Sequence, residues 1–345
     1  MSKRIGIVDV AAAAGVSATT VSHALSGQGK MAPETRERVA RVAAELGYAP
    51  NRIASALRRQ RSSIIGFVSD EVATSPFSGG IVLGAQDAAA ERGALLMVVT
   101  SNRDTTIEAQ QLDALVAQQV DAVIYARVSN KIVDAPPQLT RQPTVLVDAY
   151  DPNSALDSVI PDERQIGRLA TDRLLAAGHR VIVHLTVDET GPAARGRIDG
   201  YLDACAEAGI RARVIRMPGQ GDARAGREAL DRALAAYPDL TAAFAFNDPM
   251  AMGIYQAAME RGIEIPHALS VVSVDNLELI ASQLRPALTT VRLPHYEMGR
   301  MAVGRLFQLL EGGMRIGDRH VKLACELVER ESVGSVGSPA IVTIP

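Results

Sequence analysis

The chain of 345 residues has no tryptophan and only two cysteines, Cys205 and Cys325. The cysteines form no Cys-x-x-Cys pair, and no Cys/His cluster has the spacing of zinc ligands, so we expect neither a disulfide framework nor a metal or other cofactor. Aromatic residues make up 3% of the chain and hydrophobic residues 47%. A chain of this length and composition can bury an aliphatic core in two or three domains.

Long apolar segments and enzyme motifs are also missing. No apolar run approaches the ~18 residues of a membrane helix, and Asp9 interrupts the apolar stretch that an export signal would need. We therefore expect a soluble, cytoplasmic protein with no membrane partner. HExxH, GxSxG, P-loop and GxGxxG motifs are absent; Gly219 and Gly221 begin a similar pattern, but Arg224 stands where the third glycine belongs. We expect no enzyme, although carboxylates paired by folding stay open as an alternative.

Charge is distributed unevenly along the chain. Residues 1–61 carry ten Lys/Arg against four Asp/Glu, which leaves 26 against 35 for the rest. A basic head on an acidic body predicts a polyanionic partner for the head only.

The head contains the stretch VDVAAAAGVSATTVSHAL, with Ala11, Gly15 and Val21 at the spacing A-x3-G-x5-V. A helix-turn-helix needs a small residue where its helices touch, a glycine for the turn and an aliphatic residue in the angle. A third helix is expected from Pro33, with Gly47 at its end. An Ala-rich helical hairpin without a DNA role is the alternative.

The second helix of this stretch is the proposed recognition helix. Small polar side chains in its first two turns could reach base edges in a major groove. The candidates are Ser17, which also suits the N-cap, Ala18, Thr19, Ser22 and His23.

DVAAAAGVSATTVSHALSG, TRERV, ELGYAPNRIASALR and IIGFV follow one another in the order and spacing of the LacI/GalR family of bacterial transcription regulators, which the chain resembles. The resemblance implies a helix-turn-helix domain over 1–48, a hinge helix over 49–62 and an effector-binding and dimerisation domain over 63–345. It also implies that Leu57 wedges into the minor groove of double-stranded operator DNA, with Asn51 and Ala54 in the same segment.

The composition of the hinge segment agrees with that role. NRIASALRRQR has too few apolar residues to fold alone, and arginines for phosphates flank its leucine. A basic interdomain linker is the alternative. Many family members have arginine at the position of His23. Arginine can make a bidentate contact to guanine that imidazole cannot, so the operator half-site of this chain should differ from theirs.

Beyond the hinge, aliphatic runs alternate with helical patterns, from IIGFVS at 64–69 to SVVSV at 270–274. This alternation predicts an α/β fold with parallel sheets. The resemblance implies a two-lobed, periplasmic-binding-protein-like sensor that binds its ligand between the lobes. The first lobe is expected at about 63–161 and 291–320, and the second at about 162–290 and 321–345.

Polar residues at the ends of the predicted strands form the candidate effector site. Carboxylates, an amide and an arginine suit a polyhydroxylated ligand, because each exchanges paired hydrogen bonds with adjacent hydroxyls. The resemblance implies that these positions line the effector pocket. They are Asp70, Ser75, Phe77, Asp148, Arg197, Asn247 and Asp275.

Some of these residues have other interpretations. Phe77 could belong to the core, Arg197 and Asp275 could pair with each other, and Asp248 before Pro249 is expected to be a helix N-cap. An aromatic platform for a sugar would have to come from one of three residues, since tryptophan is absent: Phe77, Tyr125 or Tyr150.

The sequence thus predicts a sequence-specific DNA-binding repressor controlled by a small-molecule effector, a sugar or sugar derivative. A homodimer on a palindromic operator is expected from the paired recognition helices. A purine-like corepressor or a partner protein is the alternative signal. A solute-binding protein would share the body, but it would have an export signal and no basic head.

Overall fold

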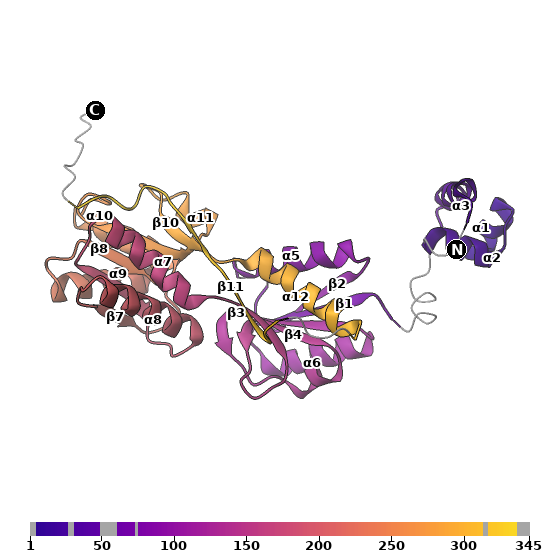
Figure 1. Ribbon diagram of the computed structural model, residues 1–345, viewed down its shortest axis with the longest axis horizontal. Coiled ribbons are helices and arrows are strands. Elements are labelled where there is room, and N and C mark those ends of the chain that lie inside the picture. The colour runs from indigo at the N-terminus through magenta and orange to yellow at the C-terminus, as the bar shows by residue number, and fades with distance from the viewer. Residues whose placement is uncertain (1–4, 27–30, 49–60, 73–74, 313–316, 337–345) are drawn as a thin grey trace, which may run out of the picture. The chain divides into compact units, whose positions relative to one another are not determined.

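The computed structural model divides the chain into two compact units, Met1–Ser63 and Ile64–Pro345. It describes residues 5–26, 31–48, 61–72, 75–312 and 317–336. The described helices of the smaller unit are α1, α2 and α3, and the described strands belong to the larger unit (Figure 1).

The smaller unit is the predicted helix-turn-helix, formed by α1 (Ile7–Ala14), α2 (Ala18–Ser26) and α3 (Pro33–Glu45). Gly15 ends α1 in the left-handed region at φ 63°, the conformation that glycine adopts most readily. Ser17 Oγ accepts the Thr20 N–H at 3.1 Å at the start of α2. Val21 is fully buried in the small core between the helices.

Among the described helices, none is by itself long and apolar enough to cross a membrane. The pair α1 and α2 meets that criterion only jointly, across a bend of 98°.

The first lobe of the larger unit is a six-stranded sheet with the order β11-β5-β4-β3-β1-β2 and parallel pairing throughout. Helices α5 and α12 cover one face, and α6 with the short 3₁₀ helix η1 covers the other. The elements are β1 (Ile64–Ser69), α5 (Ser78–Glu91), β2 (Leu95–Thr100), α6 (Thr105–Ala117), β3 (Ala122–Ile132), η1 (Pro137–Arg141), β4 (Thr144–Tyr150), β5 (Asp157–Pro161), α12 (His295–Leu310) and β11 (His320–Leu323).

The second lobe repeats this plan with the order β12-β10-β9-β8-β6-β7. Its pairings are parallel except that β12 runs antiparallel to β10. Helices α9 and α10 cover one face, and α7 and α8 the other. The elements are α7 (Glu163–Ala176), β6 (Ile182–Val187), α8 (Pro192–Glu207), β7 (Val214–Met217), α9 (Ala223–Ala236), β8 (Ala242–Ala245), α10 (Asp248–Glu260), β9 (Ser270–Asp275), α11 (Glu278–Ala281), β10 (Thr289–Arg292) and β12 (Glu326–Val328).

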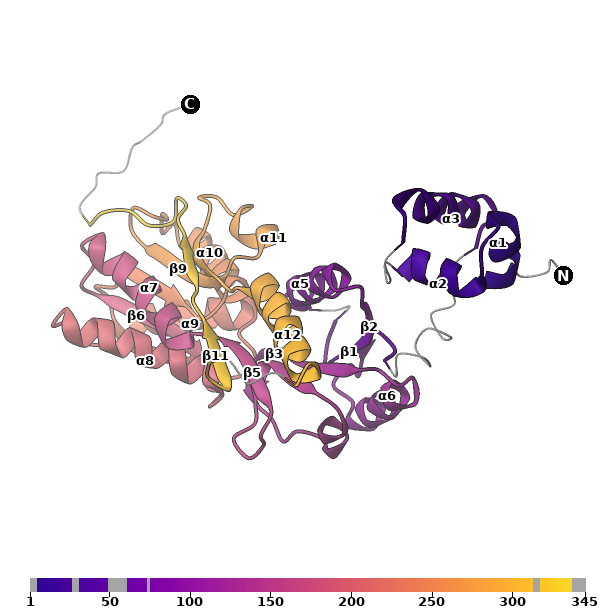
Figure 2. The ribbon, with the colours of Figure 1, turned by 45° about the vertical axis from the view of Figure 1, so that its right-hand side comes forward.

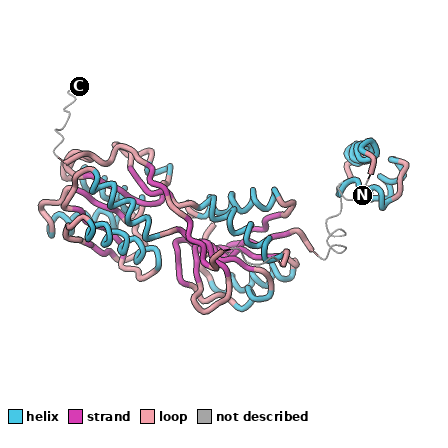
Figure 3. Tube along the Cα trace, viewed as in Figure 1, coloured by secondary structure: helices cyan, strands magenta, loops and turns pink. Residues whose placement is uncertain are grey.

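The alternation of strands and helices therefore gives the α/β fold with mostly parallel sheets that the sequence predicts, with helices flanking the strands of both lobes (Figures 2 and 3). The chain passes between the lobes after Pro161, after Arg292 and after Leu323. The sequence places these crossings near 161, 290 and 320. The last two come a few residues later because the short strands β10 and β11 complete their sheets first.

Candidate functional site

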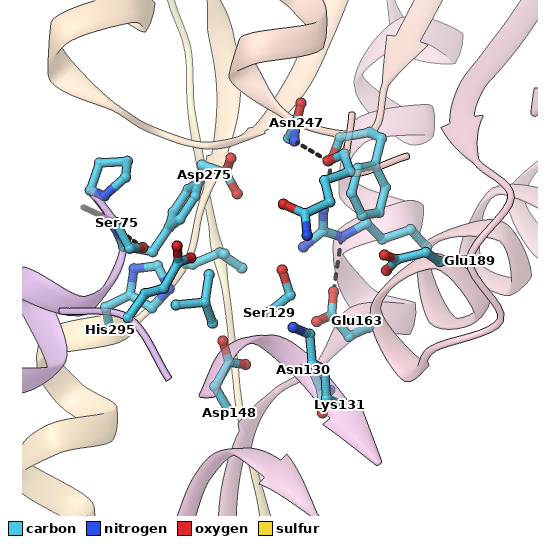
Figure 4. Close-up of a pocket in the computed structure, with 18 of the residues that line it drawn as sticks. Ser75, Ser129, Asn130, Lys131, Asp148, Glu163, Glu189, Asn247, Asp275 and His295 are labelled. Atoms are coloured by element: carbon cyan, nitrogen blue, oxygen red, sulfur yellow. Dashed lines mark hydrogen bonds and ion pairs between the residues drawn. The ribbon is translucent and has the colours of Figure 1, made fainter. Parts of the chain in front are cut away.

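A cavity of about 300 Å³ lies between the two lobes of the larger unit. Both sheets contribute the carboxyl ends of their strands to its wall, the usual place for ligands in parallel α/β sheets. Six of the seven predicted residues line it: Ser75, Phe77, Asp148, Arg197, Asn247 and Asp275. Figure 4 shows Asp148 and Asp275 approaching the cavity from opposite lobes.

Asp70 is the predicted residue that does not line this cavity. Its carboxylate Oδ1 accepts the Val128 N–H at 3.0 Å, and its Oδ2 lies 3.7 Å from Lys131 Nζ. Asp70 therefore holds the end of β3, where Ser129 adopts a left-handed φ of 66° and the pairing with β4 shifts register. Its contacts position Val128–Lys131, which form part of the wall.

Arg197 is 4% exposed and pairs with Glu163, not with Asp275. Its Nε donates to Glu163 Oε2 at 2.9 Å, and its Nη1 donates to the Phe246 carbonyl at 2.7 Å. The guanidinium carbon lies 4.5 Å from the centre of the Phe246 ring. Gly196 permits this arrangement, because a side chain there would collide with Glu163. These contacts fix the planar guanidinium in the cavity wall.

Asp148 lies two residues before the end of β4 and Asp275 is the last residue of β9, and they have left-handed φ values of 51° and 115°. Such values are uncommon for a residue other than glycine. Burial raises the pKa of both carboxyls; Glu163 adds to the effect at Asp148, and Asp248 adds to it at Asp275. Asp275 Oδ2 is buried and has no hydrogen-bond partner among the residues that the structure describes.

The N-cap of α10 is Asn247, so the prediction that Asp248 caps this helix is wrong. Asn247 Oδ1 accepts the Met250 N–H at 2.8 Å. Asp248 is instead the first residue of the helix and is fully buried. Its carboxylate accepts hydrogen bonds from the hydroxyls of Ser273 and Thr290 and from the Leu277 N–H. Burial raises its pKa to about 6.

The aromatic wall of the cavity consists of Phe77 and Phe246. Tyr125 lies in the core beneath it, with its hydroxyl bonded to Glu108 at 2.6 Å. Tyr150 packs edge-on against His320, with 5.1 Å between the ring centroids. Neither tyrosine lines the cavity, so Phe77 is the one of the three aromatic candidates named from the sequence that does.

Several polar residues of the wall were not predicted from the sequence. Glu163 is an acidic residue in the first turn of a helix, and Asn130 lies within a strand, so neither stands out in the sequence as a ligand contact. His295 lies against Phe77, with 6.2 Å between the ring centroids, and burial lowers its pKa to about 4. Only the tertiary structure brings these residues together. The others are Glu71, Arg103, Ser129, Lys131, Glu189 and Gln220.

In the smaller unit, the proposed recognition residues lie at the N-cap and in the first two turns of α2. Ser17, Thr19 and His23 are exposed, and Ala18 and Ser22 are half-buried. The proposed hinge residues Asn51, Ala54 and Leu57 lie outside the described residues. Within the described ranges, no group of three or more His, Cys, Asp or Glu residues is arranged to hold a metal ion.

Comparisons with known proteins cover both units. Residues 6–51 match the family described as bacterial regulatory proteins, lacI family, and residues 171–333 match the periplasmic binding protein-like domain. The chain is 31% identical to the HTH-type transcriptional regulator DegA of Bacillus subtilis (strain 168), over 96% of this chain and 99% of that protein. It is 30% identical to the ribose operon repressor of Haemophilus influenzae, over 95% and 98%.

Solved structures of similar proteins have the same architecture. The lac repressor dimer bound to operator and the anti-inducer ONPF matches with a TM-score of 0.77 and 28% identity, over 96% of this chain and 100% of that one. The complex of the transcriptional regulator CelR with cellobiose matches with a TM-score of 0.68 and 29% identity, over 95% and 100%. These relatives are named as regulators of transcription and not as enzymes.

Proposed function

Because the chain belongs to the LacI family of bacterial regulatory proteins, we propose that it is a repressor whose affinity for operator DNA is set by a small polyhydroxylated effector bound between the lobes. The observation that carries this proposal is the interlobe cavity, in which a fixed arginine and two buried carboxylates face a space of about 300 Å³. The same chain carries the helix-turn-helix that such an effector would control.

The DNA-binding half of the proposal rests on α2 and the hinge segment. Small side chains on the first turns of a recognition helix can contact base edges in the major groove. We assign this role to Ser17, Ala18, Thr19, Ser22 and His23. Asn51, Ala54 and Leu57 would contact the operator centre, with Leu57 as the minor-groove wedge.

The effector half rests on the chemistry of the cavity wall. Asp148 and Asp275 accept hydrogen bonds, Arg197 donates them, and the amide of Asn247 can do both. Adjacent hydroxyls of a sugar ring need such paired acceptors and donors, while Phe77 and Phe246 can pack against its apolar face. Relatives named for cellobiose and ribose support a sugar or sugar derivative.

We also propose a homodimer, because each half of a palindromic operator needs its own recognition helix. Strand β2 is an edge strand of the first sheet and exposes Leu95 and Val98, while Met259 and Leu279 of the second lobe are 77% and 87% exposed. Unpaired edges and exposed apolar side chains are typical of interfaces. Sedimentation equilibrium of the full chain checks this assignment, which a purely monomeric species at micromolar concentration would contradict.

The proposed coupling is a change in the angle between the lobes. An effector bound between them would favour one angle in the dimer, and the two hinge segments would then lie at a different separation. An effector shifts such an equilibrium only by its differential affinity for the two states, and roughly 1–3 kcal/mol corresponds to about a 5- to 150-fold change in operator affinity.

The test begins with selection of an operator from random DNA by the full chain. Thermal unfolding is then followed against a panel of sugars, sugar derivatives and purines, and each ligand found is added to the operator complex. A ligand at 100 times its dissociation constant should add about 2.7 kcal/mol to stability. A sugar that stabilises the chain and changes operator affinity supports the proposal. A purine that has these two effects contradicts the sugar assignment. So does a chain that binds the operator but whose stability and operator affinity no small molecule changes.

A further inference from the structure

The three cationic side chains that line the interlobe cavity are each held by a carboxylate. Because a paired cation has already found its counter-charge, an anionic ligand would have to compete with that carboxylate. The pairs are Arg103 with Glu71 at 2.7 Å, Arg197 with Glu163 at 2.9 Å and Lys131 with Asp70 at 3.7 Å.

Three carboxylates of the wall have no such partner. Within the part of the chain that the structure describes, no ion pair joins Asp148, Glu189 or Asp275 to a lysine, arginine or histidine. Asp148 and Asp275 are only 3% and 7% exposed, and they come from opposite lobes (Figure 4). Glu189 lies at the exposed rim. The ionisable groups of the wall that lack a counter-charge are therefore carboxyl groups, and a cationic ligand would favour their ionised form, which burial alone disfavours.

Among the described residues, two buried acceptor atoms of the wall also find no hydrogen-bond donor. They are Asp275 Oδ2 and Asn130 Oδ1, on residues that are 7% and 3% exposed. A buried acceptor without a donor costs free energy, so a ligand that brings donors into this space is favoured. His295 supplies no positive charge near neutral pH, because burial lowers its pKa to about 4.

From this arrangement we propose that the cavity selects its effector by charge. A polyol that carries a protonated amine is held more tightly than the neutral polyol of the same stereochemistry, and a phosphorylated polyol is excluded. The physical reason is that an ammonium group donates charge-assisted hydrogen bonds to the unpaired carboxylates, whereas a phosphate would meet them with like charge. This inference rests on the proposed function, since it concerns the ligand of the same cavity.

The test uses matched sugars and the full chain. Glucose, galactose and mannose are each compared with their 2-amino-2-deoxy and 6-phosphate derivatives by calorimetric titration at pH 6.5, and release of a selected operator is measured in parallel. For the series whose stereochemistry fits, we expect the amine to bind about tenfold more tightly than the neutral sugar, the ratio that ~1.4 kcal/mol provides. The phosphate should show no binding at millimolar concentration.

Charge-removing variants test which carboxylates are responsible. Asp148→Asn and Asp275→Asn should each reduce the ratio of amine to neutral-sugar affinity toward one. Glu228→Gln is the matched control, because Glu228 is a half-buried carboxylate that pairs with Arg224 on α9, outside the cavity wall. It should leave the ratio unchanged.

Each outcome supports or overturns the charge selection. Amines that bind no better than the neutral sugars overturn it, and so does a phosphate that binds and loses affinity in Lys131→Met. If neutral sugars or phosphates alter operator affinity without an amine preference, the proposed function stands and only the charge selection fails. If no compound in any series binds or alters operator affinity, both fail for these ligands.

Discussion

Arg197 and Asp275 are both buried in the wall of the cavity, but their charges are balanced differently. Arg197 is paired with Glu163 and bonded to a carbonyl, whereas Asp275 Oδ2 has no partner. Burial without a partner raises the free energy of an ionised carboxylate. The folded state is therefore less stable at pH values at which such a group is ionised. A bound ligand that donates hydrogen bonds or carries a positive charge would therefore favour the ionised form of Asp275.

Asp275→Asn should stabilise the ligand-free protein at neutral pH. Burial, and then the charge of Asp248, raises the pKa of Asp275 in the folded state, so the folded state holds this proton more tightly than the unfolded state. Stability is therefore lost as pH rises above the unfolded pKa of about 3.9. Urea unfolding at pH 4 and pH 7 should show a gain for the variant of at least about 1 kcal/mol at pH 7 that shrinks at pH 4. An equal effect at both pH values would contradict this account.

Arg197→Lys should weaken effector binding at least tenfold and leave operator affinity without effector unchanged. Lysine keeps a positive charge near Glu163 but cannot bond both that carboxylate and the Phe246 carbonyl through one planar group. Calorimetry and DNA-binding anisotropy measure the two affinities. Arg224→Lys, at an exposed residue of α9, is the matched control. Unchanged effector affinity in Arg197→Lys would remove Arg197 from the site.

At this scale the sequence indicated which polar residues gather but not how they pair. Strand ends are recognisable from the alternation of apolar runs, and this placed Asp148 and Asp275 in the same cleft. Glu163 was missed because an acidic residue in the first turn of a helix usually needs no other explanation. The exchange of roles between Asn247 and Asp248 depends on a one-residue shift of the helix start, which local pattern does not resolve.

At the scale of elements, closely packed helix pairs hold the sheets. Helices α5 and α12 cross where Gly84 faces Tyr296 and Gly299 faces Ile81, and a side chain at either glycine would collide with the opposite backbone carbonyl. Both helices pack on the first sheet, and α12 follows the second interlobe crossing. A change in the packing of α5 against α12 would therefore alter the position of the cavity wall.

Gly84→Ala should destabilise the larger unit by about 1–3 kcal/mol, the usual cost of overpacking a core. The added methyl group would overlap the Tyr296 carbonyl oxygen. Gly79→Ala, in the first turn of the same helix, meets no atom within 4 Å and should be neutral or slightly stabilising. Thermal unfolding of the two variants compares the effects. Equal stability of both would show that the α5–α12 contact is loose.

The hinge segment is the element that would connect the cavity to DNA. Leu57→Ala should weaken binding to the selected operator far more than binding to unrelated DNA, since a wedge contributes only where the duplex is kinked. Binding of the variant is measured to both DNAs at one salt concentration, because phosphate contacts vary steeply with salt. An equal loss on the two DNAs would contradict the wedge assignment.

For the molecule as a whole, the order of strands and helices was predictable, because aliphatic runs alternate with helical patterns along the sequence. Parallel sheets follow from that alternation. The antiparallel strand β12 was not, since three residues carry little pattern. The charge of the cavity could not be predicted either, because it depends on which carboxylates find a cation after folding.

The measurement that tests the central claim most directly is the dissociation constant of the full chain for its selected operator, without effector and with a saturating effector. Binding is followed by fluorescence anisotropy at constant salt. Control of DNA binding from the interlobe cavity predicts a change of about 5- to 150-fold, which Arg197→Lys should reduce at the same effector concentration. Identical operator affinities with and without a ligand that demonstrably occupies the cavity would contradict the account.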